Sequence, residues 1–426
     1  MATDERQSSA GIGIGASVRK FFDRYGLGFV MVASYFGSGS VFIASSAGVQ
    51  YGYALLWAAI GAVLFGFMAQ DMSARLGIFG ESLMVFTRRK LGRVGATAVA
   101  LLLSVGCVAW CLELTAAVGK GVAVLSGGAV GWQPVAVLTG LAAIVTGVQS
   151  YDRIEQVMTA MMFALLIAYL VVAGASAPAP AAVATGLLPS LPDPGALTLV
   201  AAIIGTTALW PNFFLESILV EEKGWTDAES VPTMRRDLGL GYLVGGLTTV
   251  AIIVATAAVL RPMGINSLET FITPGRALAE VLGGWALVLF LVGALAAAFN
   301  SIVPIMWTPA YVIPQALGHD VTPDDRGFKL LYAGLVAVGT LSPLVHEVFG
   351  LSVVEMIILF PAYNGVVGLP LTALLLFWAV NDDRTMGEHD NGLALNVVNV
   401  SLVLLAVFLA VSSAGDVFGA ILSGSL

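Results

Sequence analysis

The sequence predicts an all-α polytopic membrane protein, and this class follows from its composition and from the spacing of its apolar runs. Hydrophobic residues make up 58% of the 426 residues, and charged residues only 11%. Apolar runs recur along the whole chain, and each has about the 20 residues with which a helix crosses the hydrocarbon of a bilayer. The lipid bilayer is therefore the expected surroundings, and a soluble globular domain is excluded.

Eleven apolar segments are expected to cross the membrane as helices. They cover residues 27–47, 53–74, 94–119, 132–149, 154–175, 197–222, 237–260, 279–314, 328–347, 351–380 and 393–415. The first and the sixth of these segments carry small or helix-breaking residues in their middle, so each is expected to consist of two half-helices.

The break in the first segment falls at Gly37, Ser38, Gly39 and Ser40. Each glycine weakens a helix by about 1 kcal/mol relative to alanine, and serine competes for backbone hydrogen bonds. Unwound backbone at membrane depth is tolerated only where it faces protein or a watery cavity. The break therefore predicts a binding site, although the same small residues could instead form a notch for close helix packing.

The sixth segment repeats this pattern between Gly205 and Asn212. Pro211 disfavours helix at the preceding residue and suits the first turn of a new helix. The side chains that this second break would bring to the site are Thr206, Thr207, Leu209, Trp210 and Asn212. Trp210 is expected to form a wall of the site or to stack on a cation.

The two broken helices lie five segments apart and cross the membrane in opposite directions. Such paired breaks are typical of secondary transporters that consist of two inverted repeats and bind their substrate at the midplane. The chain is accordingly divided into a cytoplasmic tail (1–26), a first repeat (27–175), an external Pro-rich loop expected to be extended (176–196), a second repeat (197–380), and a cytoplasmic loop with the eleventh helix (381–426).

The positive charges predict the orientation in the membrane, because Lys and Arg collect in cytoplasmic loops. With the N-terminus in the cytoplasm, all but three of the 19 Lys and Arg residues lie on the inner side. The three exceptions are Lys120, Arg261 and Arg276. An odd number of helices then places the C-terminus outside, in a membrane of the bacterial inner-membrane type.

Ionisable side chains inside the expected helices mark candidate coupling residues, because a charge in the bilayer is costly. Glu113, Glu216 and Glu355 are the three candidates. Glu113 and Glu216 are expected to carry protons, whereas Glu355 lies close enough to a helix end to be solvated. Lys223 follows Glu216 by about two turns and is grouped with the coupling residues, although it could instead be the structural partner of Glu216. Asn300, in the eighth segment, could complete the site or bridge two helices.

No nucleophile with a base, nucleotide-binding loop or metal-ligand cluster is visible, so an enzyme is not expected, and neither a cofactor nor a bound metal is predicted. Cys107 and Cys111 lie inside an apolar run, where free cysteine behaves as a small hydrophobic residue. His319, His346 and His389 are expected in loops or at helix ends. The expected partners are a small-molecule or ion substrate and the lipid bilayer, with no nucleic acid. The sequence predicts no oligomeric state, and a monomer would suffice.

Several stretches carry a family resemblance. They are Ala47–Trp57 (Ala-Gly-Val-Gln-Tyr-Gly-Tyr-Ala-Leu-Leu-Trp), Met72–Ile78, Asn212–Ser217 and Asn381–Glu388. The chain resembles the NRAMP family (natural resistance-associated macrophage protein) of metal-ion transporters over most of its length. The resemblance implies a LeuT-type fold, with inverted five-helix repeats plus an eleventh transmembrane helix. It also implies transport of divalent transition metals, usually with protons, by alternating access.

The ligand positions of that family differ in this chain. Where the family's first helix breaks at Asp-Pro-Gly-Asn, this chain has Gly-Ser-Gly-Ser at 37–40, and Met-Pro-His of the sixth helix corresponds to Leu209–Pro211. The soft thioether that favours transition metals is thereby lost. Glu113 matches an acidic residue of the family's third helix, whereas the second acidic position is Ala116. Lys223 matches a basic residue near the inner end of the sixth helix.

Without an anionic ligand at the break, a bare divalent ion would rely on hydroxyls, carbonyls and water. We therefore predict an NRAMP-related secondary active transporter, coupled to protons, whose substrate is a small solute rather than a transition metal. One alternative is a divalent metal cation transporter, for an ion such as Mn, Fe or Mg, in which Glu113, Asn300 or the ion's own waters replace the missing ligands. The other alternative is a membrane sensor that keeps the fold without transporting.

Overall fold

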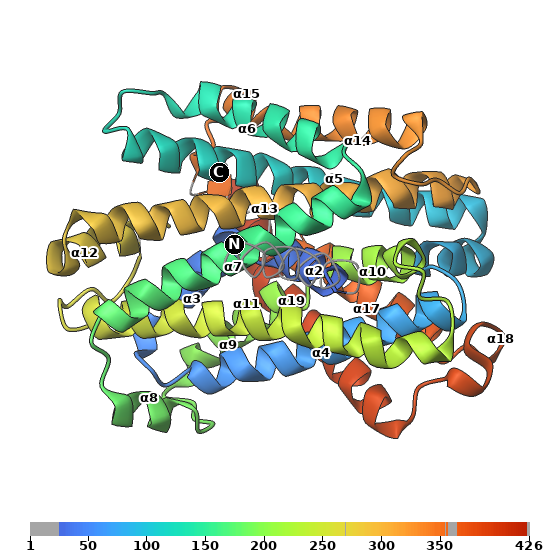
Figure 1. The fold of residues 1–426 in the computed structure, drawn as a ribbon, viewed down its shortest axis with the longest axis horizontal. Helices are drawn as coiled ribbons and strands as arrows, with labels where there is room; N and C mark the ends of the chain where they lie inside the picture. The colour runs from blue at the N-terminus through green and yellow to red at the C-terminus, as the bar shows by residue number, and fades with distance from the viewer. Residues whose placement is uncertain (1–24, 269, 354, 357–363, 424–426) are drawn as a thin grey trace, which may run out of the picture.

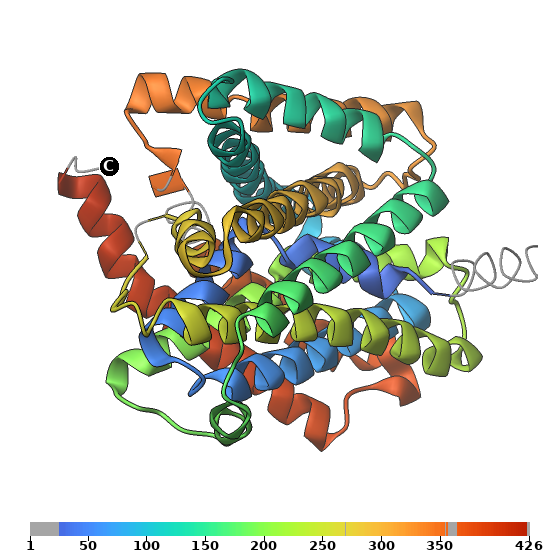
Figure 2. The ribbon, with the colours of Figure 1, turned by 60° about the vertical axis from the view of Figure 1, so that its left-hand side comes forward.

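The structure is a computed structural model, and it describes residues 25–268, 270–353, 355–356 and 364–423. In these residues the chain forms a bundle of helices, most of which run along one common direction (Figures 1 and 2). No strand occurs in the described part of the chain. The all-α class predicted from the sequence is therefore confirmed.

The helices alternate with connections along the described residues. In chain order they are α2 (Leu27–Tyr35), α3 (Ser38–Tyr51), α4 (Leu56–Phe79), α5 (Leu83–Leu125), α6 (Trp132–Gly147), α7 (Tyr151–Ala175), α8 (Pro180–Gly186), α9 (Pro194–Thr207), α10 (Trp210–Glu222), α11 (Val231–Val259), α12 (Thr273–Leu282), α13 (Gly284–Leu317), α14 (Arg326–Gly339), α15 (Ser342–Phe349), α17 (Leu369–Ala379), α18 (Asp383–Met386) and α19 (Leu393–Ser423). A π-helical turn at Asn364–Gly368 leads directly into α17.

Seven helical segments of the described chain are long and apolar enough to cross a membrane, and two bent pairs qualify if each pair forms one span. One pair is α2 with α3, bent by 66°, and the other is Val366–Ala379 with Asp383–His389, bent by 62°. The shorter apolar helices are α6 and Leu393–Phe408. Each of the eleven predicted segments thus coincides with helical structure, except that residues 354 and 357–363 of the tenth lie outside the described residues.

Both predicted breaks occur, and they share one backbone geometry. After α2, Phe36 leaves the helical conformation with φ −90° and ψ 71°, and α3 begins after the extended Gly37. After α9, Ala208 adopts φ −88° and ψ 65°, and α10 begins after the extended Leu209. Pro211 occupies the first turn of α10, where its missing N–H costs nothing.

The half-helix α2 is enclosed by protein, since all of its residues are buried. Its first turn rests on α11, because the backbone N–H groups of Gly26 and Gly28 each donate to the Asp237 carboxylate at 2.7 Å. A negative charge at a helix N-terminus is favourable. A Cβ at Gly28 would lie 2.4 Å from the carbonyl oxygen of Asp237, so only glycine allows this close approach.

Three predicted features differ in the structure. The loop at 176–196 is not simply extended, because it contains α8, and α9 begins earlier than predicted, since Asp193 accepts a hydrogen bond from Ala196 N and caps it. The segment predicted at 279–314 is divided at Gly283, whose φ of 96° ends α12 and starts α13. The segment predicted at 328–347 is likewise divided into α14 and α15.

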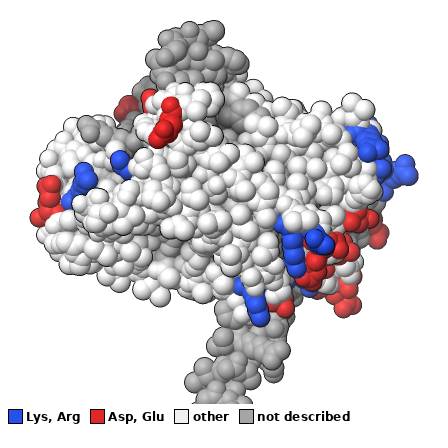
Figure 3. All heavy atoms as spheres, turned by 90° about the horizontal axis from the view of Figure 1, so that it is seen from above, with Lys and Arg blue, Asp and Glu red and all other residues white. Residues whose placement is uncertain are grey.

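Charged side chains gather at the two ends of the molecule, and a broad uncharged belt lies between them (Figure 3). Large hydrophobic side chains are exposed on helices of this belt, for example Leu64 with 60%, Val105 with 58% and Val145 with 64% of its surface exposed. Exposed apolar surface of this extent marks contact with lipid. The belt therefore matches the hydrocarbon layer that the sequence predicts.

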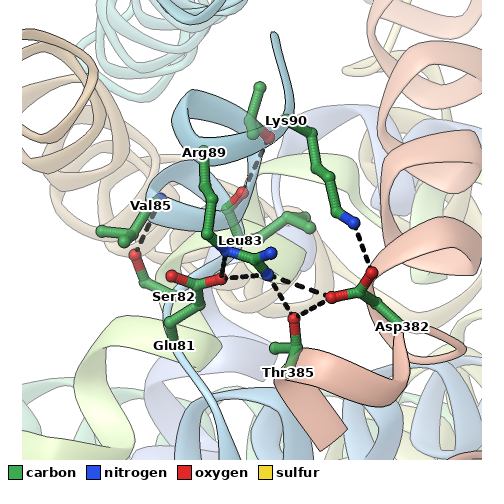
Figure 4. Close-up of polar contacts among 9 residues, drawn as sticks. Glu81, Ser82, Leu83, Val85, Arg89, Lys90, Asp382 and Thr385 are labelled. Atoms are coloured by element: carbon green, nitrogen blue, oxygen red, sulfur yellow. Dashed lines mark hydrogen bonds and ion pairs between the residues drawn. The ribbon is translucent and has the colours of Figure 1, made fainter. Parts of the chain in front are cut away.

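A group of polar side chains ties the start of α5 to the connection between α17 and α18 (Figure 4). We call it the polar cluster, and its members are Glu81, Arg89, Lys90, Asp382 and Thr385. Arg89 donates to Glu81 Oε1 at 2.7 Å and to Asp382 Oδ2 at 3.1 Å. Asp382 also accepts from Thr385 at 2.6 Å and pairs with Lys90. The cluster precedes a kink in α5 at Gly92, whose φ is 70° and ψ 177°.

Replacing Asp382 by asparagine (Asp382→Asn) is expected to lower the free energy of unfolding by about 1–3 kcal/mol, because hydrogen bonds to charged donors are weakened. Partial burial alone would raise the pKa of Asp382, but hydrogen bonds from Lys90, Thr385 and Arg89 lower it below its ordinary value. The stabilisation is therefore present above the ordinary aspartate pKa of about 3.9 and fades as the pH falls below it. Thermal unfolding between about pH 8 and about pH 3 measures this difference.

Asp324→Asn is the matched control, because Asp324 faces Lys329 at 3.4 Å with 85% of its side chain exposed. An exposed pair of this kind contributes little to stability. Equal losses of stability in the two variants would contradict the role given to the polar cluster, and so would an effect of Asp382→Asn that does not weaken in acid.

Candidate functional site

The two helix breaks lie beside α5 and α13. A Cβ at Gly37 would lie 3.1 Å from the Leu114 side chain of α5 and 3.1 Å from Ser301 Oγ of α13. At the second break, the Trp210 ring stacks on Trp110 of α5, with ring centroids 6.0 Å apart. The predicted residues of both breaks therefore line one region, and α5 contributes to it at both places.

Glu113 reaches the first break from α5. The Ser38 hydroxyl donates a hydrogen bond to Glu113 Oε1, and the Glu113 side chain is only 1% exposed. Ser38 begins α3, so the carboxylate lies at a helix N-terminus, where a negative charge is favourable. A Cβ at Gly39 would meet nothing within 4 Å, so open space adjoins the first turn of α3.

A narrow cavity adjoins the first break between α3 and α9. Its lining residues are Tyr35, Ser40, Ile43, Ala44, Ile203, Thr206, Thr207 and Thr249. It offers about 10 Å³ to the centre of a water-sized sphere, which is roughly the space of one water molecule. Ser40 donates to the carbonyl oxygen of Tyr35 at 2.6 Å, and the Tyr35 hydroxyl has no hydrogen-bond partner among the described residues.

The two threonines of the second break are engaged by their own helix. Thr206 and Thr207 both donate to the carbonyl oxygen of Ile203, at 3.1 Å and 2.8 Å. Such bonds back into the preceding turn are common for threonine in membrane helices. In this conformation their hydroxyl hydrogens are therefore engaged, and their oxygen atoms can still accept hydrogen bonds or bind a cation.

The start of α10 is held between neighbouring helices. Leu209 precedes α10 in extended conformation, and the Trp210 ring is enclosed, since a Cβ at Gly368 would lie 2.3 Å from its Nε1. Asn212 Nδ2 donates to the carbonyl oxygen of Met31 on α2 at 2.8 Å. Asn212 Oδ1 has no partner among the described residues, so one amide oxygen remains available beside the break.

Asn300 and Ser301 place polar groups of α13 next to α2. Ser301 Oγ donates to the carbonyl oxygen of Ala33 at 2.7 Å and lies 3.2 Å from that of Ala297. Asn300 is 0% exposed, and neither its Oδ1 nor its Nδ2 has a partner in the part of the chain described. The structure therefore gives no support to Asn300 as a hydrogen-bonded bridge between helices.

The alternative in which Lys223 is the structural partner of Glu216 does not occur in the structure. Lys223 Nζ lies 2.9 Å from Glu155 Oε1 of α7, and both side chains are nearly fully buried. Lys223 follows the last residue of α10, where α7 brings a nearer carboxylate than the one two turns back on the same helix. Both carboxylate oxygens of Glu216 lack a partner among the described residues, which leaves a buried carboxyl group unpaired within the bundle.

Glu355 has a structural role at a helix start. Ser352 N donates to Glu355 Oε2 at 2.6 Å, and Glu355 N donates to Ser352 Oγ at 3.2 Å. This reciprocal arrangement is a capping box, which satisfies backbone donors at a helix N-terminus. Glu355 is thus explained without a part in coupling.

Sequence reasoning did not select Tyr35, Trp110 or Thr249, although each lies at the site. Tyr35 directly precedes the break, so its position gave a usable signal. Ser301 was also missed as a site residue, and its place next to Asn300 could have indicated it. Trp110 and Thr249 lie within ordinary apolar stretches, and only the packing of α5 and α11 brings them here.

The atoms around the first break that could bind a cation are oxygen atoms. They belong to the Glu113 carboxylate and to the Ser38 and Ser40 hydroxyls, and hard cations prefer such ligands. No group of three or more His, Cys, Asp or Glu side chains that could hold a metal ion occurs in the described residues. A divalent ion at this place would accordingly keep part of its hydration shell.

Sequence comparison gives a family and several relatives. Residues 28–414 match the family described as natural resistance-associated macrophage protein-like (Nramp). The divalent metal cation transporter MntH of Mycobacterium tuberculosis is 27% identical over 409 residues, which cover 90% of each chain. MntH of Aeromonas hydrophila is 25% identical and covers 90% of this chain and 93% of its own.

Solved structures agree with the sequence match. A manganese transporter of Eremococcus coleocola, solved as a single-site mutant, has a TM-score of 0.78 at 18% identity and covers 95% of this chain and 88% of its own. MhsT in complex with L-phenylalanine has a TM-score of 0.62 at 17% identity and covers 92% and 98%. These likenesses show the predicted LeuT-type fold. Because the family match extends over most of the chain, the protein belongs to the Nramp family of membrane transporters.

Proposed function

We propose that this protein moves a divalent metal cation across a cell membrane by alternating access. The relatives compared above are divalent metal cation transporters, and one structural neighbour is a manganese transporter. They favour the metal alternative over the small solute that the sequence predicts. The observation that carries the proposal is the contact of Ser38 with Glu113, which supplies a carboxylate to a break without an acidic residue of its own.

The donor set favours a hard ion that keeps some of its water. Glu113 provides one negative charge, and the hydroxyls of Ser38 and Ser40 provide neutral ligands. Ions such as Mg²⁺ and Mn²⁺ accept carboxylate, carbonyl and water ligands. Leu209 stands at the position where the family has a methionine, so a soft thioether is not supplied there.

Transport requires the half-helices to move. The cavity between α3 and α9 has room for about one water molecule, which is too little for a partly hydrated divalent ion. The two breaks are the points at which α3 can tilt against α2, and α9 against α10, because neither helix pair is continuous. In transporters of this kind, rigid parts rock around a fixed site.

We assign proton coupling to Glu113 and Glu216, with Lys223 as a nearby fixed charge. Glu216 is buried and its carboxylate oxygens have no partner in the described chain. A carboxyl group at such depth is suited to take up and release a proton as its surroundings change. The proposed orientation, with the N-terminus in the cytoplasm and the C-terminus outside, rests on the distribution of Lys and Arg.

Glu113→Gln is expected to reduce divalent-metal binding and uptake by at least about 10–100-fold, because it removes the single charge at the first break. The measurement is Mn²⁺- or Mg²⁺-dependent quenching of an indicator dye inside proteoliposomes, together with isothermal binding of the same ions. Glu113→Asp keeps the charge but shortens the side chain, so it should retain part of the affinity.

Ser104→Ala is the matched control for Glu113→Gln. Ser104 is a buried residue of the same helix whose hydroxyl donates only to Ala100 O, at 2.6 Å. Divalent-metal uptake by Glu113→Gln equal to that by Ser104→Ala would contradict the metal proposal. Binding without uptake in the parent protein would instead favour the membrane sensor.

Leu209→Met is expected to raise binding and uptake of Cd²⁺ several-fold relative to Mg²⁺, because a thioether at the second break favours soft ions. Competition between the two ions in the proteoliposome assay measures the ratio. Leu219→Met is the control, since Leu219 is buried farther along α10. An unchanged ratio in Leu209→Met, or an equal rise in Leu219→Met, would place the ion away from the start of α10.

Glu216→Gln is expected to fold normally, because it removes a buried carboxyl group that has no partner to lose. Metal uptake should persist but should no longer respond to an imposed pH gradient. A pH-sensitive dye inside the proteoliposomes measures the accompanying proton flux, and Glu222→Gln, at the exposed end of α10, serves as control. Proton flux equal to that of the parent protein would rule out Glu216 as a coupling residue.

A further inference from the structure

We propose that a groove between α6 and α7 binds one anionic phospholipid, with the lipid phosphate at Arg153 and an acyl chain between the two helices. The groove opens to the surface of the bundle and offers about 430 Å³ to the centres of water-sized spheres, against about 10 Å³ in the cavity beside the first break. The site lies apart from both breaks, and the proposal does not depend on which ion is transported.

The groove exists because α6 and α7 diverge from a short connection. α6 ends at Gly147 and α7 begins at Tyr151, and the two helices separate from there (Figures 1 and 2). α13 holds the narrow end of the groove in place. Buried Trp307 donates from Nε1 to the carbonyl oxygen of Gly147 at 3.0 Å, and its ring centroid lies 6.2 Å from that of Tyr151. The packing on α13 therefore fixes the space between the two helices.

The part of the groove farther from the connection has apolar walls that suit an acyl chain. Val145 of α6 and Val157 and Ala160 of α7 line it, and the two valines are 64% and 41% exposed. Ala160 follows Arg153 by seven residues, so the groove extends along α7 for about two turns, or roughly 10 Å. Because α7 is apolar and long enough to cross a membrane, these walls face hydrocarbon, and a lipid chain covers them without loss.

The end of the groove at the connection carries a positive charge. Arg153 lines it, and its only hydrogen-bond partner among the described residues is Gln149 Oε1, at 3.1 Å. A guanidinium has five N–H donors, so most of them remain for a phosphate, which arginine binds through paired hydrogen bonds. Gln156 also lines the groove, on the same face of α7 as Arg153. Asp152 is exposed and is not among the lining residues.

The combination of charge and apolar depth favours a phospholipid over a soluble anion. A free phosphate would be held by one exposed arginine in competition with water, and it would leave the apolar walls uncovered. A phospholipid covers these walls and supplies the phosphate from the same molecule. With the N-terminus in the cytoplasm, the connection between α6 and α7 faces the cytoplasm, where anionic lipids attract Lys and Arg next to a membrane helix.

The same turn of α7 that would hold the lipid also holds a buried ion pair. Glu155 follows Arg153 by two residues, and its Oε1 lies 2.9 Å from Lys223 Nζ, at the end of α10. A lipid that restrains the first turn of α7 therefore also restrains the contact of α7 with α10. Lipid binding is accordingly expected to stabilise the folded protein in this conformation.

The test compares phosphatidylglycerol with phosphatidylcholine of the same acyl chains on the purified full-length protein. Phosphatidylglycerol should remain bound as one molecule in native mass spectrometry and should raise the unfolding temperature in a saturable manner, because a ligand of the folded state stabilises it. Phosphatidylcholine should do both more weakly, and soluble sn-glycerol 3-phosphate should do neither. Equal binding of the two lipids would overturn the proposal, and so would an equal temperature shift with sn-glycerol 3-phosphate, which would indicate a site for free phosphate.

Arg153→Gln is expected to weaken phosphatidylglycerol binding about five-fold, the contribution of one cationic side chain next to anionic lipid. Arg153→Lys keeps the charge and should retain most of the binding. Arg326→Gln is the matched control, because Arg326 is exposed at the start of α14 and does not line the groove. Equal binding by Arg153→Gln and Arg326→Gln would contradict the placement of the phosphate.

Ala160→Trp fills the apolar part of the groove and should abolish retention of the lipid although Arg153 is intact. Leu138→Trp is its control, since Leu138 is 61% exposed on α6 and does not line the groove. Retention of the lipid by Ala160→Trp, or its loss in Leu138→Trp as well, would overturn the assignment to this groove. Native mass spectrometry and unfolding report binding without ion transport, so failure here and failure of the proposed function are separate results.

Discussion

A helix that breaks inside a membrane must find partners for its backbone groups within the protein, because no water is available in the hydrocarbon. The first break of this chain depends on that requirement. Ser301 of α13 donates to Ala33 O, Asn212 of α10 donates to Met31 O, and Ser40 of α3 closes the break locally. The polar contacts that satisfy the backbone carbonyls of α2 therefore also hold three other helices around it. The contacts that form the site are thus also contacts that hold these helices of the bundle together.

The placement of charge follows from this arrangement. The break itself is neutral, with Gly-Ser-Gly-Ser at 37–40, and the carboxylate comes from Glu113 on α5. A ligand on a neighbouring helix ties the strength of ion binding to the distance between α3 and α5. Any tilt of α3 that separates Ser38 from Glu113 would weaken the proposed metal site, so the movement that opens the site would also release its ion.

Local features of the sequence predicted the fold and both breaks, because glycine, serine and proline act on their own backbone. The phi and psi changes occur at Phe36 and Ala208, within one residue of the predicted positions. Contacts between helices were not predictable in this way. Sequence spacing offered Glu216, two turns back, as a possible partner of Lys223, whereas the carboxylate that Lys223 contacts is Glu155 on α7. The spacing of residues in the sequence predicts neighbours on the same helix, whereas neighbours on different helices depend on how the helices pack.

The same limit explains why the comparisons do not support the small-solute prediction. The small-solute prediction compared ligands position by position within the broken helices, and there the carboxylate is indeed missing. Glu113 lies 75 residues along the chain from Ser38, yet contacts it. The carboxylate lies at the N-terminal end of α3, where a negative charge is favourable, so the break receives its charge from the packing of α5 and not from its own residues.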